Sequence, residues 1–180
     1  VDEETGRVTL LRHVAVDDCG TVINPLLLQG QQHGGAAAGI SQTMYEEVVY
    51  DDNGNPLTAT LLDYALPSAA EFPSFDVHST ETRTPLNPLG AKGVGEAGAT
   101  GAVPTITNAV IDALRPLGVH TLDLPYTPHR IWQAIREIPG VLGAQGLEAL
   151  QEGPGLREAS ELHEGLAQVF HGFRKAGAQA

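Results

Sequence analysis

The sequence has 180 residues, of which 42% are hydrophobic and 18% are charged, and its formal net charge is −12. These values are typical of one globular domain with a sizeable core, and they argue against a disordered chain. The strong negative charge argues against nucleic acid or an anionic membrane surface as a main partner. No apolar run is long enough to span a bilayer. The single cysteine, Cys19, cannot form an internal disulfide, which fits a reducing compartment, and we expect the cytoplasm.

Antiparallel hairpins are expected in the first half of the chain. Residues 1–22 combine early turn residues with a strand-like run, Val8–Val16, and predict a first hairpin. Residues 46–60 predict a second hairpin around a turn at residues 51–56. Residues 75–80 alternate as a strand does.

Helix signals follow each of these regions. Asn24 is a predicted N-cap, with Pro25 at the first helical position, and the helix is expected to run to about Tyr45. A second helix is predicted to begin at Pro104 and to end before Gly118. A third is predicted to begin at residues 127–128 and to bury one face, formed by Ile131, Ile135 and Ile138. The expected fold class is therefore α+β, with antiparallel hairpins packed against two or three helices.

The first predicted helix contains a run of glycines between Gly30 and Gly39. Each glycine costs a helix about 1 kcal/mol relative to alanine, so the run requires an explanation. Two interpretations stay open: close packing against another element, or a surface of small residues that lets a bulky ligand approach the backbone, with Gln31 offering its amide. A lone histidine such as His33 is more typical of a hydrogen-bonded structural residue than of a ligand. The histidines show no paired metal-ligand spacing, so no protein-bound metal site is expected.

Residues 90–98 form a glycine-rich loop that contains one cation, Lys92, and one acid, Glu96. Glycine permits positive φ and close approach of backbone to a ligand, and successive free N–H groups can form an anion-binding nest. As the only acid of the loop, Glu96 is the candidate for proton chemistry. A plain turn is the alternative. A dinucleotide fingerprint is set aside because two prolines precede the loop where a strand is required, although a general phosphate site remains a weaker possibility.

The character of the sequence changes after Ile138. Residues 139–180 begin with a Gly/Pro-rich linker and continue with an amphipathic helical pattern, which predicts a tail that covers the body or a partner chain.

Five stretches occur in the same order as in one known family: residues 16–25, 30–35, 63–67, 85–98 and 127–132. Together they resemble the C-terminal end of the large, molybdenum-binding subunit of the xanthine oxidase and aldehyde oxidase family, in the aerobic carbon monoxide dehydrogenase-like branch. The resemblance covers roughly residues 7–138. It implies that residues 1–138 are the C-terminal segment of a molybdopterin-binding domain.

The resemblance also implies a cofactor and site residues. Family members hold molybdenum through a pterin dinucleotide, usually the cytosine form in bacteria, without a protein ligand on the metal in most members. Copper is added in true carbon monoxide dehydrogenases. The residue matching Glu96 is the catalytic base, and the one matching Gln31 hydrogen-bonds the cofactor. The loop matching Lys92, Gly93, Val94 and Gly95 runs beside the pterin and the metal.

The expected function is therefore that of a molybdopterin-dependent oxidoreductase acting on carbon monoxide, an aldehyde or an N-heterocycle. Because the chain begins at Val1 and family subunits are several times longer, we expect a piece that is inactive alone. Its implied partners are the N-terminal remainder of the large subunit, iron–sulfur and FAD subunits or domains, and a small-molecule substrate. The alternative is a non-catalytic interaction module that docks a partner through its C-terminal helix.

Overall fold

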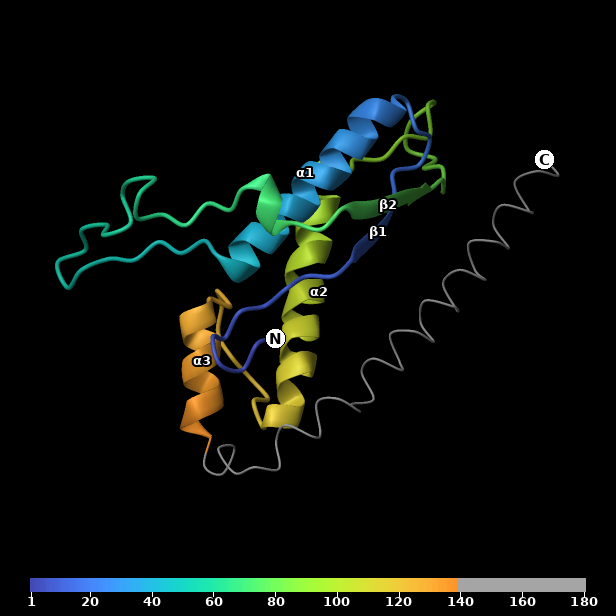
Figure 1. The fold of residues 1–180 in the computed structure, drawn as a ribbon. Coiled ribbons are helices and arrows are strands. Elements are labelled where there is room, and N and C mark those ends of the chain that lie inside the picture. The colour runs from blue at the N-terminus through green and yellow to red at the C-terminus, as the bar shows by residue number, and fades with distance from the viewer. Residues whose placement is uncertain (139–180) are drawn as a thin grey trace.

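Three α-helices and a two-stranded sheet make up the part of the chain that the structure describes. The computed structural model describes residues 1–138. In chain order the elements are β1 (His13–Asp18), α1 (Pro25–Met44), the 3₁₀ helix η1 (Ala69–Glu71), β2 (Phe75–Thr80), α2 (Ala97–Leu114), the 3₁₀ helix η2 (Arg115–Leu117) and α3 (Pro128–Glu137). Figure 1 shows α1 crossing the start of α2, and α3 lying beside the far half of α2. The expected mixture of helix and strand is confirmed.

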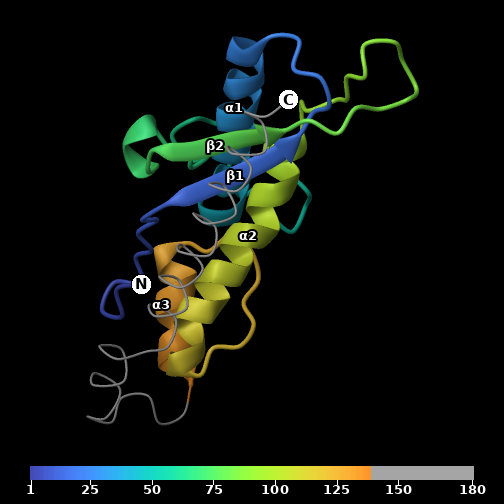
Figure 2. The same cartoon turned by 90° about the vertical axis from the view of Figure 1, so that its right-hand side faces the viewer.

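The sheet is parallel, so the expectation of antiparallel hairpins is wrong. β1 pairs with β2 in parallel, with His13 opposite Phe75 and Asp18 opposite Thr80. The segment before β1 does not fold back on it, because its turn is fixed elsewhere: Gly6 has φ of +70°, and a Cβ there would lie 2.0 Å from the carbonyl oxygen of Pro128. The two strands lie across the α1–α2 pair (Figure 2).

Residues 46–66, which we call the arm, extend from the body instead of forming the second hairpin (Figure 1). Their turn is where the sequence predicts it, and Asp51 closes it by accepting from the backbone N–H groups of Asn53 and Asn55. Tyr50 and Pro56 form one isolated antiparallel bridge, with no ladder on either side of it. Proline has no N–H to donate, which limits pairing at that position.

The first and third predicted helices are confirmed. The side chain of Asn24 accepts from the N–H groups of Leu26 and Leu27, at 3.1 and 3.2 Å, and Pro25 is the first residue of α1. Thr127 caps α3, whose Ile131 and Ile135 are buried. Ile138 lies just beyond the end of α3 and is partly buried.

The predicted start of the second helix is wrong, because α2 begins at Ala97 and Pro104 lies inside it. Close packing against α1 compensates for Gly98 in the first turn, whereas nothing lies within 4 Å of a Cβ built at Gly101. A Cβ at Gly98 would lie 2.9 Å from the backbone nitrogen of Ala36, and one at Gly39 would lie 2.7 Å from the Cβ of Ala102. Tertiary contact therefore overrides the weak helix propensity of this stretch.

The core lies between the helices, on the side away from the glycine-rich loop. It contains these buried side chains: Ile40, Met44, Ala102, Ile106, Val110, Leu114, Leu117, Val119, Tyr126, Ile131 and Ile135. Within residues 1–138, no helix has the length and apolar character that a membrane crossing requires. The predicted linker and tail at residues 139–180 lie outside the described residues.

Candidate functional site

The glycine-rich loop is attached to the chain that follows β1. The N–H of Lys92 donates to the carbonyl of Cys19 at 2.8 Å, and the N–H of Thr21 donates to the carbonyl of Gly90 at 3.1 Å. The two backbones pass so closely that a Cβ at Gly20 would lie 2.2 Å from the oxygen of Gly90, and both glycines have positive φ. These two glycines are therefore required by the crossing itself.

Lys92, the cation of the glycine-rich loop, pairs with a carboxylate that lies outside the loop. The Nζ of Lys92 lies 3.2 Å from Oδ2 of Asp18, the last residue of β1. The Oδ1 of the same side chain accepts from the N–H groups of Gly20 at 2.9 Å and Thr82 at 3.0 Å. Hydrogen bonds from the side chain and backbone of Thr82, with a further one from Gly20, hold the pKa of the Asp18 carboxyl well below its usual range. Asp18 is thus ionised at neutral pH and serves as an anchor for the loop.

Gln31 of α1 and the glycine-rich loop come together around one pocket. This pocket has a volume of about 260 Å³ and is lined by Gln31, Lys92 and Val94, together with apolar side chains such as Ile23 and Leu27. Cys19, which is buried and free, also lines it.

Gly95 and Gly93 leave space in the loop because they have no side chains. A Cβ at Gly95 would lie 3.8 Å from the Oε1 of Gln31, whereas nothing lies within 4 Å of one built at Gly93. Neither residue has positive φ, and among residues 90–98 only Gly90 does. What these positions offer is open space and backbone beside the glutamine amide.

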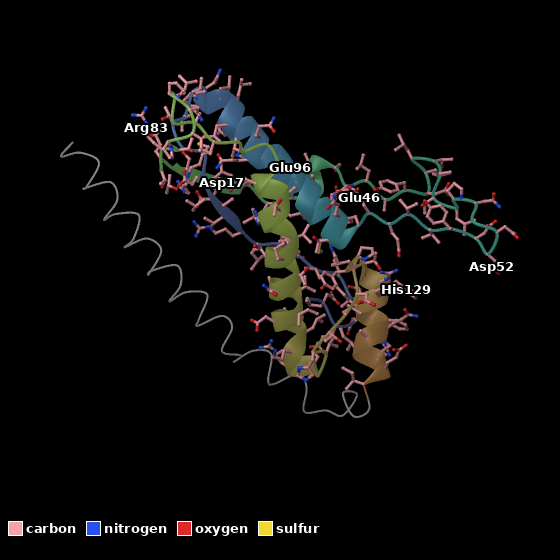
Figure 3. The ribbon with its side chains drawn as sticks, turned by 180° about the vertical axis from the view of Figure 1, so that it is seen from behind. Asp17, Glu46, Asp52, Arg83, Glu96 and His129 are labelled. Atoms are coloured by element: carbon pink, nitrogen blue, oxygen red, sulfur yellow. The ribbon has the colours of Figure 1, made fainter. Side chains whose placement is uncertain are left out.

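Glu96 is the N-cap residue of α2, and its side chain makes no capping hydrogen bond. It lies at the end of α2 that meets α1 (Figure 3). The carboxylate is exposed, so residues 1–138 do not provide the desolvated setting that suits a base. Figure 3 also places Asp17 on the same side of the molecule, whereas Asp52 lies at the distant tip of the arm.

The sequence left two interpretations for the glycines of α1, close packing or room for a ligand, and each applies to one pair of them. Gly35 and Gly39 face α2, where a Cβ would come within 3.0 Å of the other helix. Gly30 and Gly34 face open space, with nothing within 4 Å of an added Cβ. Close packing therefore explains one pair, and the other pair remains available for a ligand that approaches the helix backbone.

The structure adds residues that sequence reasoning missed. Gln32, 3% exposed, donates from Nε2 to Oδ2 of Asp17 at 2.9 Å and to the carbonyl of His78 at 2.7 Å. Asn87 holds the start of the loop, because its side-chain amide donates to the carbonyl of Ala91 and accepts from the N–H of that residue. The only sequence signal for Gln32 and Asn87 was that they lie within residues 30–35 and 85–98, two of the stretches that carry the family resemblance.

His33 lies in aromatic surroundings. The ring of His33 packs edge-on against Phe75 at 5.8 Å, and its Nε2 is buried without a hydrogen-bond partner in the described part of the chain. The expected hydrogen bond is therefore absent at that atom. Within residues 1–138, no group of three or more His, Cys, Asp or Glu side chains could hold a metal ion.

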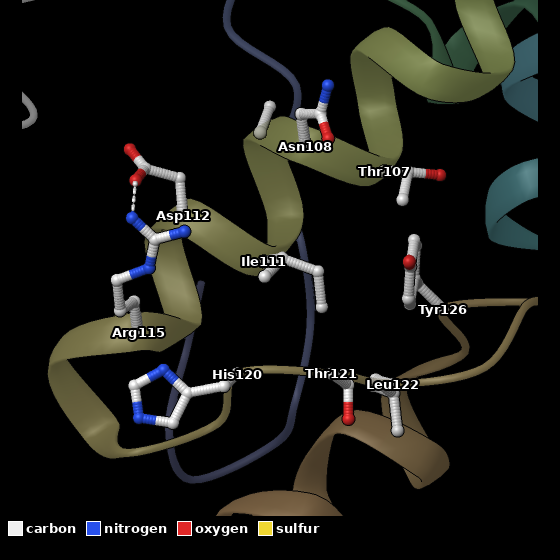
Figure 4. A pocket seen from close by; sticks show the side chains of 10 residues that line it. Thr107, Asn108, Ile111, Asp112, Arg115, His120, Thr121, Leu122 and Tyr126 are labelled. Carbon is white, nitrogen blue, oxygen red and sulfur yellow. Dashed lines mark ion pairs between the residues drawn. The ribbon is translucent and has the colours of Figure 1, made fainter.

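A second pocket, of about 620 Å³, lies at the opposite end of α2 (Figure 4). Thr107, Asp112, His120 and Tyr126 are among the residues that line it, and Asp112 pairs with Arg115 at 3.6 Å. None of the residues that the sequence assigns to a site lies there. The candidate site is therefore the smaller pocket beside Gln31.

The chain is similar to known molybdopterin-dependent oxidoreductases over most of its described length. Residues 1–73 match the molybdopterin cofactor-binding domain. The carbon monoxide dehydrogenase large chain of Hydrogenophaga pseudoflava is 44% identical over 137 residues, which are 76% of this chain and 17% of that one. A crystal structure of Cu,Mo-CO dehydrogenase in its carbon monoxide reduced state superposes with a TM-score of 0.73 at 40% identity, covering 76% of this chain and 17% of that one. The chain is homologous to the molybdenum-binding large subunits of the xanthine oxidase family.

The family likeness extends beyond the described residues. The nicotine 6-hydroxylase large subunit of Paenarthrobacter nicotinovorans is 36% identical over 167 residues, which are 88% of this chain and 20% of that one. Residues 1–138 make up only about three quarters of the chain, so this alignment continues past residue 138. The expectation that the resemblance ends there is wrong for this relative. The chain spans less than a quarter of the length of these molybdenum-binding relatives.

The residues around the pocket suit the organic part of a molybdopterin cofactor. The Gln31 amide is a donor and an acceptor without a partner in residues 1–138, and open space lies over Gly93 and Gly34. The N–H groups of Gly93 and Gly95 likewise have no acceptor among the described residues. Free amide donors beside space of this kind can bind a polar ring or a phosphate, so the residues fit the group that the family name implies.

Proposed function

We propose that the chain is the C-terminal portion of a molybdenum hydroxylase large subunit and contributes part of a molybdopterin dinucleotide site. The cofactor is molybdenum held by the cytosine dinucleotide form of molybdopterin, with copper in addition if the enzyme oxidises carbon monoxide. The substrate is carbon monoxide, an aldehyde or an N-heterocycle, and the enzyme acts in the cytoplasm. The observation that carries the proposal is the meeting of Gln31 with Lys92 and Val94 around one pocket, with Gly95 close to the Gln31 amide.

Each residue of the pocket has a proposed task. Gln31 hydrogen-bonds the cofactor through its free amide, and the backbone of residues 92–95 runs beside it. When bound, the cofactor supplies the redox chemistry, while the protein supplies position and electrostatics. Glu96 is the general base: its carboxylate lacks a capping bond and can accept a proton from the reacting oxygen. Further polypeptide must cover Glu96, because an exposed carboxylate is a poor base at neutral pH.

The proposed partner that covers Glu96 is the polypeptide that carries the rest of the large subunit. The arm presents a row of exposed apolar side chains: Val48, Val49, Tyr50, Leu57, Leu61, Leu62 and Leu66. An apolar surface of this extent is typical of an interaction site. The arm also lies within the residues that match the cofactor-binding domain, so it belongs to the shared fold of much longer relatives.

The arm's polar groups indicate the chemistry of that partner. Glu46 accepts from Tyr64 Oη at 2.5 Å and from the hydroxyl of Ser41 in α1, and Asp63 accepts from Thr60 at 2.7 Å, so both carboxylates already have partners within the chain. No lysine or arginine occurs between Arg12 and Arg83. The complementary surface is therefore apolar with basic residues at its border. Iron–sulfur and FAD subunits or domains complete the proposed enzyme.

Substitution of the base tests the proposal. The chain is co-expressed with the Hydrogenophaga pseudoflava carbon monoxide dehydrogenase large chain from which the aligned segment has been removed, together with the partner subunits of that enzyme. Dye reduction is then measured with carbon monoxide, an aldehyde and an N-heterocycle. Glu96→Gln is expected to lower turnover by a factor of about 10² to 10⁴, the usual contribution of a general base.

The control is Glu137→Gln, at the exposed end of α3, which is expected to leave turnover unchanged. Molybdenum content is measured for each variant, so that loss of cofactor is not taken for loss of the base. Full turnover of Glu96→Gln would remove Glu96 from the mechanism. Molybdenum-free wild-type complexes without turnover would favour the non-catalytic interaction module instead.

A further inference from the structure

The two aspartates that end β1, Asp17 and Asp18, have no part in the proposed chemistry. Consecutive residues of a strand point to opposite faces of the sheet, so the two carboxylates reach different elements. Asp17 contacts Gln32 of α1, and Asp18 contacts Lys92 of the glycine-rich loop. These are the two elements that supply Gln31 and the loop backbone to the pocket.

We propose that Asp17 and Asp18 are positioning residues that set the spacing between Gln31 and loop residues 92–95. This inference rests on the proposed function, since it concerns the same site. It assigns the pair to no chemical step, because neither carboxylate lines the pocket. Each acts through a neighbouring residue.

Asp18 determines where the loop lies. Its Oδ1 accepts from two backbone N–H groups, each two residues beyond the end of a strand, Gly20 after β1 and Thr82 after β2, and so fixes the carboxylate near both strand ends. Its Oδ2 is left for the ammonium of Lys92, at 3.2 Å. The lowered pKa of Asp18, caused first by the hydrogen bonds from Thr82, keeps this oxygen charged at neutral pH.

Asp17 determines how α1 is rotated. The Nε2 of Gln32 donates to Asp17 Oδ2 and to the carbonyl of His78, so both of its hydrogens are used on the two strands. Gln32 is buried, which makes loss of these bonds costly. Successive helical residues differ by about 100° in direction, so fixing Gln32 on the sheet also fixes the direction of Gln31 toward the loop.

One consequence concerns Lys92. Its ammonium is paired with Asp18 and is not a free positive charge in the pocket, although its side chain lines the wall. Lys92 therefore contributes to the site by holding the loop in place. A lysine whose charge is already paired attracts an anionic ligand less than an unpaired one does.

Asp18→Asn tests the loop contact with little other change. The asparagine oxygen can keep both backbone hydrogen bonds, whereas its NH₂ group replaces the oxygen that faces Lys92. Deuterium exchange of the full-length chain is expected to be about fivefold faster in peptides covering residues 90–96, as for a partly exposed ion pair. Exchange in residues 106–114 is expected to stay unchanged. The control is Asp52→Asn, the same chemical change at the arm tip, with no expected effect.

Lys92→Met, alone and combined with Asp18→Asn, completes a double-mutant cycle. If the ion pair is the link, Asp18→Asn has no further effect on loop exchange once Lys92 has been replaced. Additive effects, or wild-type exchange in the Asp18→Asn loop, would overturn the assignment of Asp18.

Gln32→Met tests the α1 contact, with Gln42→Met, an exposed position of the same helix, as its control. In the complex with the complementary large-chain polypeptide, the rate of molybdenum release is measured where circular dichroism shows every variant folded. Asp18→Asn and Gln32→Met are expected to release molybdenum about tenfold faster, while both controls match wild type. Unchanged release in the two variants would overturn the inference.

The two proposals fail in different ways. A wild-type complex that never holds molybdenum would refute the proposed function, and the exchange experiment would still decide whether Asp18 fixes the loop. A complex that holds molybdenum equally well in all variants would refute the positioning role alone.

Discussion

His13 is a buried imidazole in a place where a charge is unfavourable. The residue is 5% exposed, and its ring meets Phe75 edge-on at 5.7 Å, across the pairing of β1 with β2. Burial lowers the pKa of His13 below its ordinary value of 6.5. The folded state therefore keeps the neutral ring at pH values where the unfolded chain already binds a proton.

The pH dependence follows from that difference. Because the folded pKa is depressed, the contribution of His13 to stability is complete above pH 6.5 and is lost as the pH falls below that value. We expect the free energy of unfolding, measured by urea titration between pH 7.5 and 5.5, to fall less steeply in His13→Phe than in wild type. His129→Phe, at an exposed position, should keep the wild-type slope. Equal slopes in all three proteins would contradict this explanation.

At the scale of residues, the sequence draws attention to the candidate site residues but not to the residues that hold them in place. Gln31, Lys92 and Glu96 stand out because an amide, a cation and an acid lie among glycines. Asp18 and Gln32 give no such signal, because their roles depend on partners far away in the chain. The contact of Asp18 with Lys92 spans 74 positions, and that of Gln32 with His78 spans 46. No local pattern encodes either pairing.

At the scale of elements, the crossing of α1 and α2 depends on glycine. A Cβ at Gly39 would lie 2.7 Å from that of Ala102 and 2.9 Å from the carbonyl of Ala99, whereas one at Gly34 meets nothing within 4 Å. We expect Gly39→Ala to destabilise the chain by about 1–3 kcal/mol through overpacking. Gly34→Ala should instead stabilise it by up to about 1 kcal/mol, since alanine is the better helix former.

Urea denaturation of the two variants measures the difference directly. Both substitutions add the same methyl group to the same helix, so propensity is matched and only the surroundings differ. If both variants were stabilised equally, the helices would not be in the close contact described here.

Elements with local signals could be predicted, and elements with distant partners could not. The bounds of α1 and α3 follow from caps and proline at the first turn, which act within a few residues. The strand at residues 75–80 was found from its alternation, but its partner and direction were not. The start of α2 was missed because Gly98, which discourages a helix locally, is needed for the contact of α2 with α1.

At the scale of the whole molecule, the arm separates stability from assembly. Leu61 and Leu62 are 83% and 94% exposed, so they contribute little to the folded chain alone. Leu61→Ser with Leu62→Ser is expected to change the free energy of unfolding by no more than about 0.5 kcal/mol per site. The same pair should weaken co-purification with the complementary large-chain polypeptide at least tenfold, because those leucines become buried in the proposed complex.

Leu11→Ser is the matched control, since Leu11 is also 83% exposed but lies outside the arm. It should leave both measurements unchanged. A double arm variant that assembles as well as wild type would show that the partner docks elsewhere.

The parallel pairing of β1 with β2 also bears on the order in which the chain acquires its shape. Residues 13–18 find their partner only at residues 75–80, after α1 and the whole arm have left the ribosome. Pairing across such a separation carries a large loop-closure cost and is slow compared with helix formation. A nascent chain stalled before residue 75 would therefore lack the β2 partner of β1, and an unpaired strand edge favours aggregation or chaperone binding.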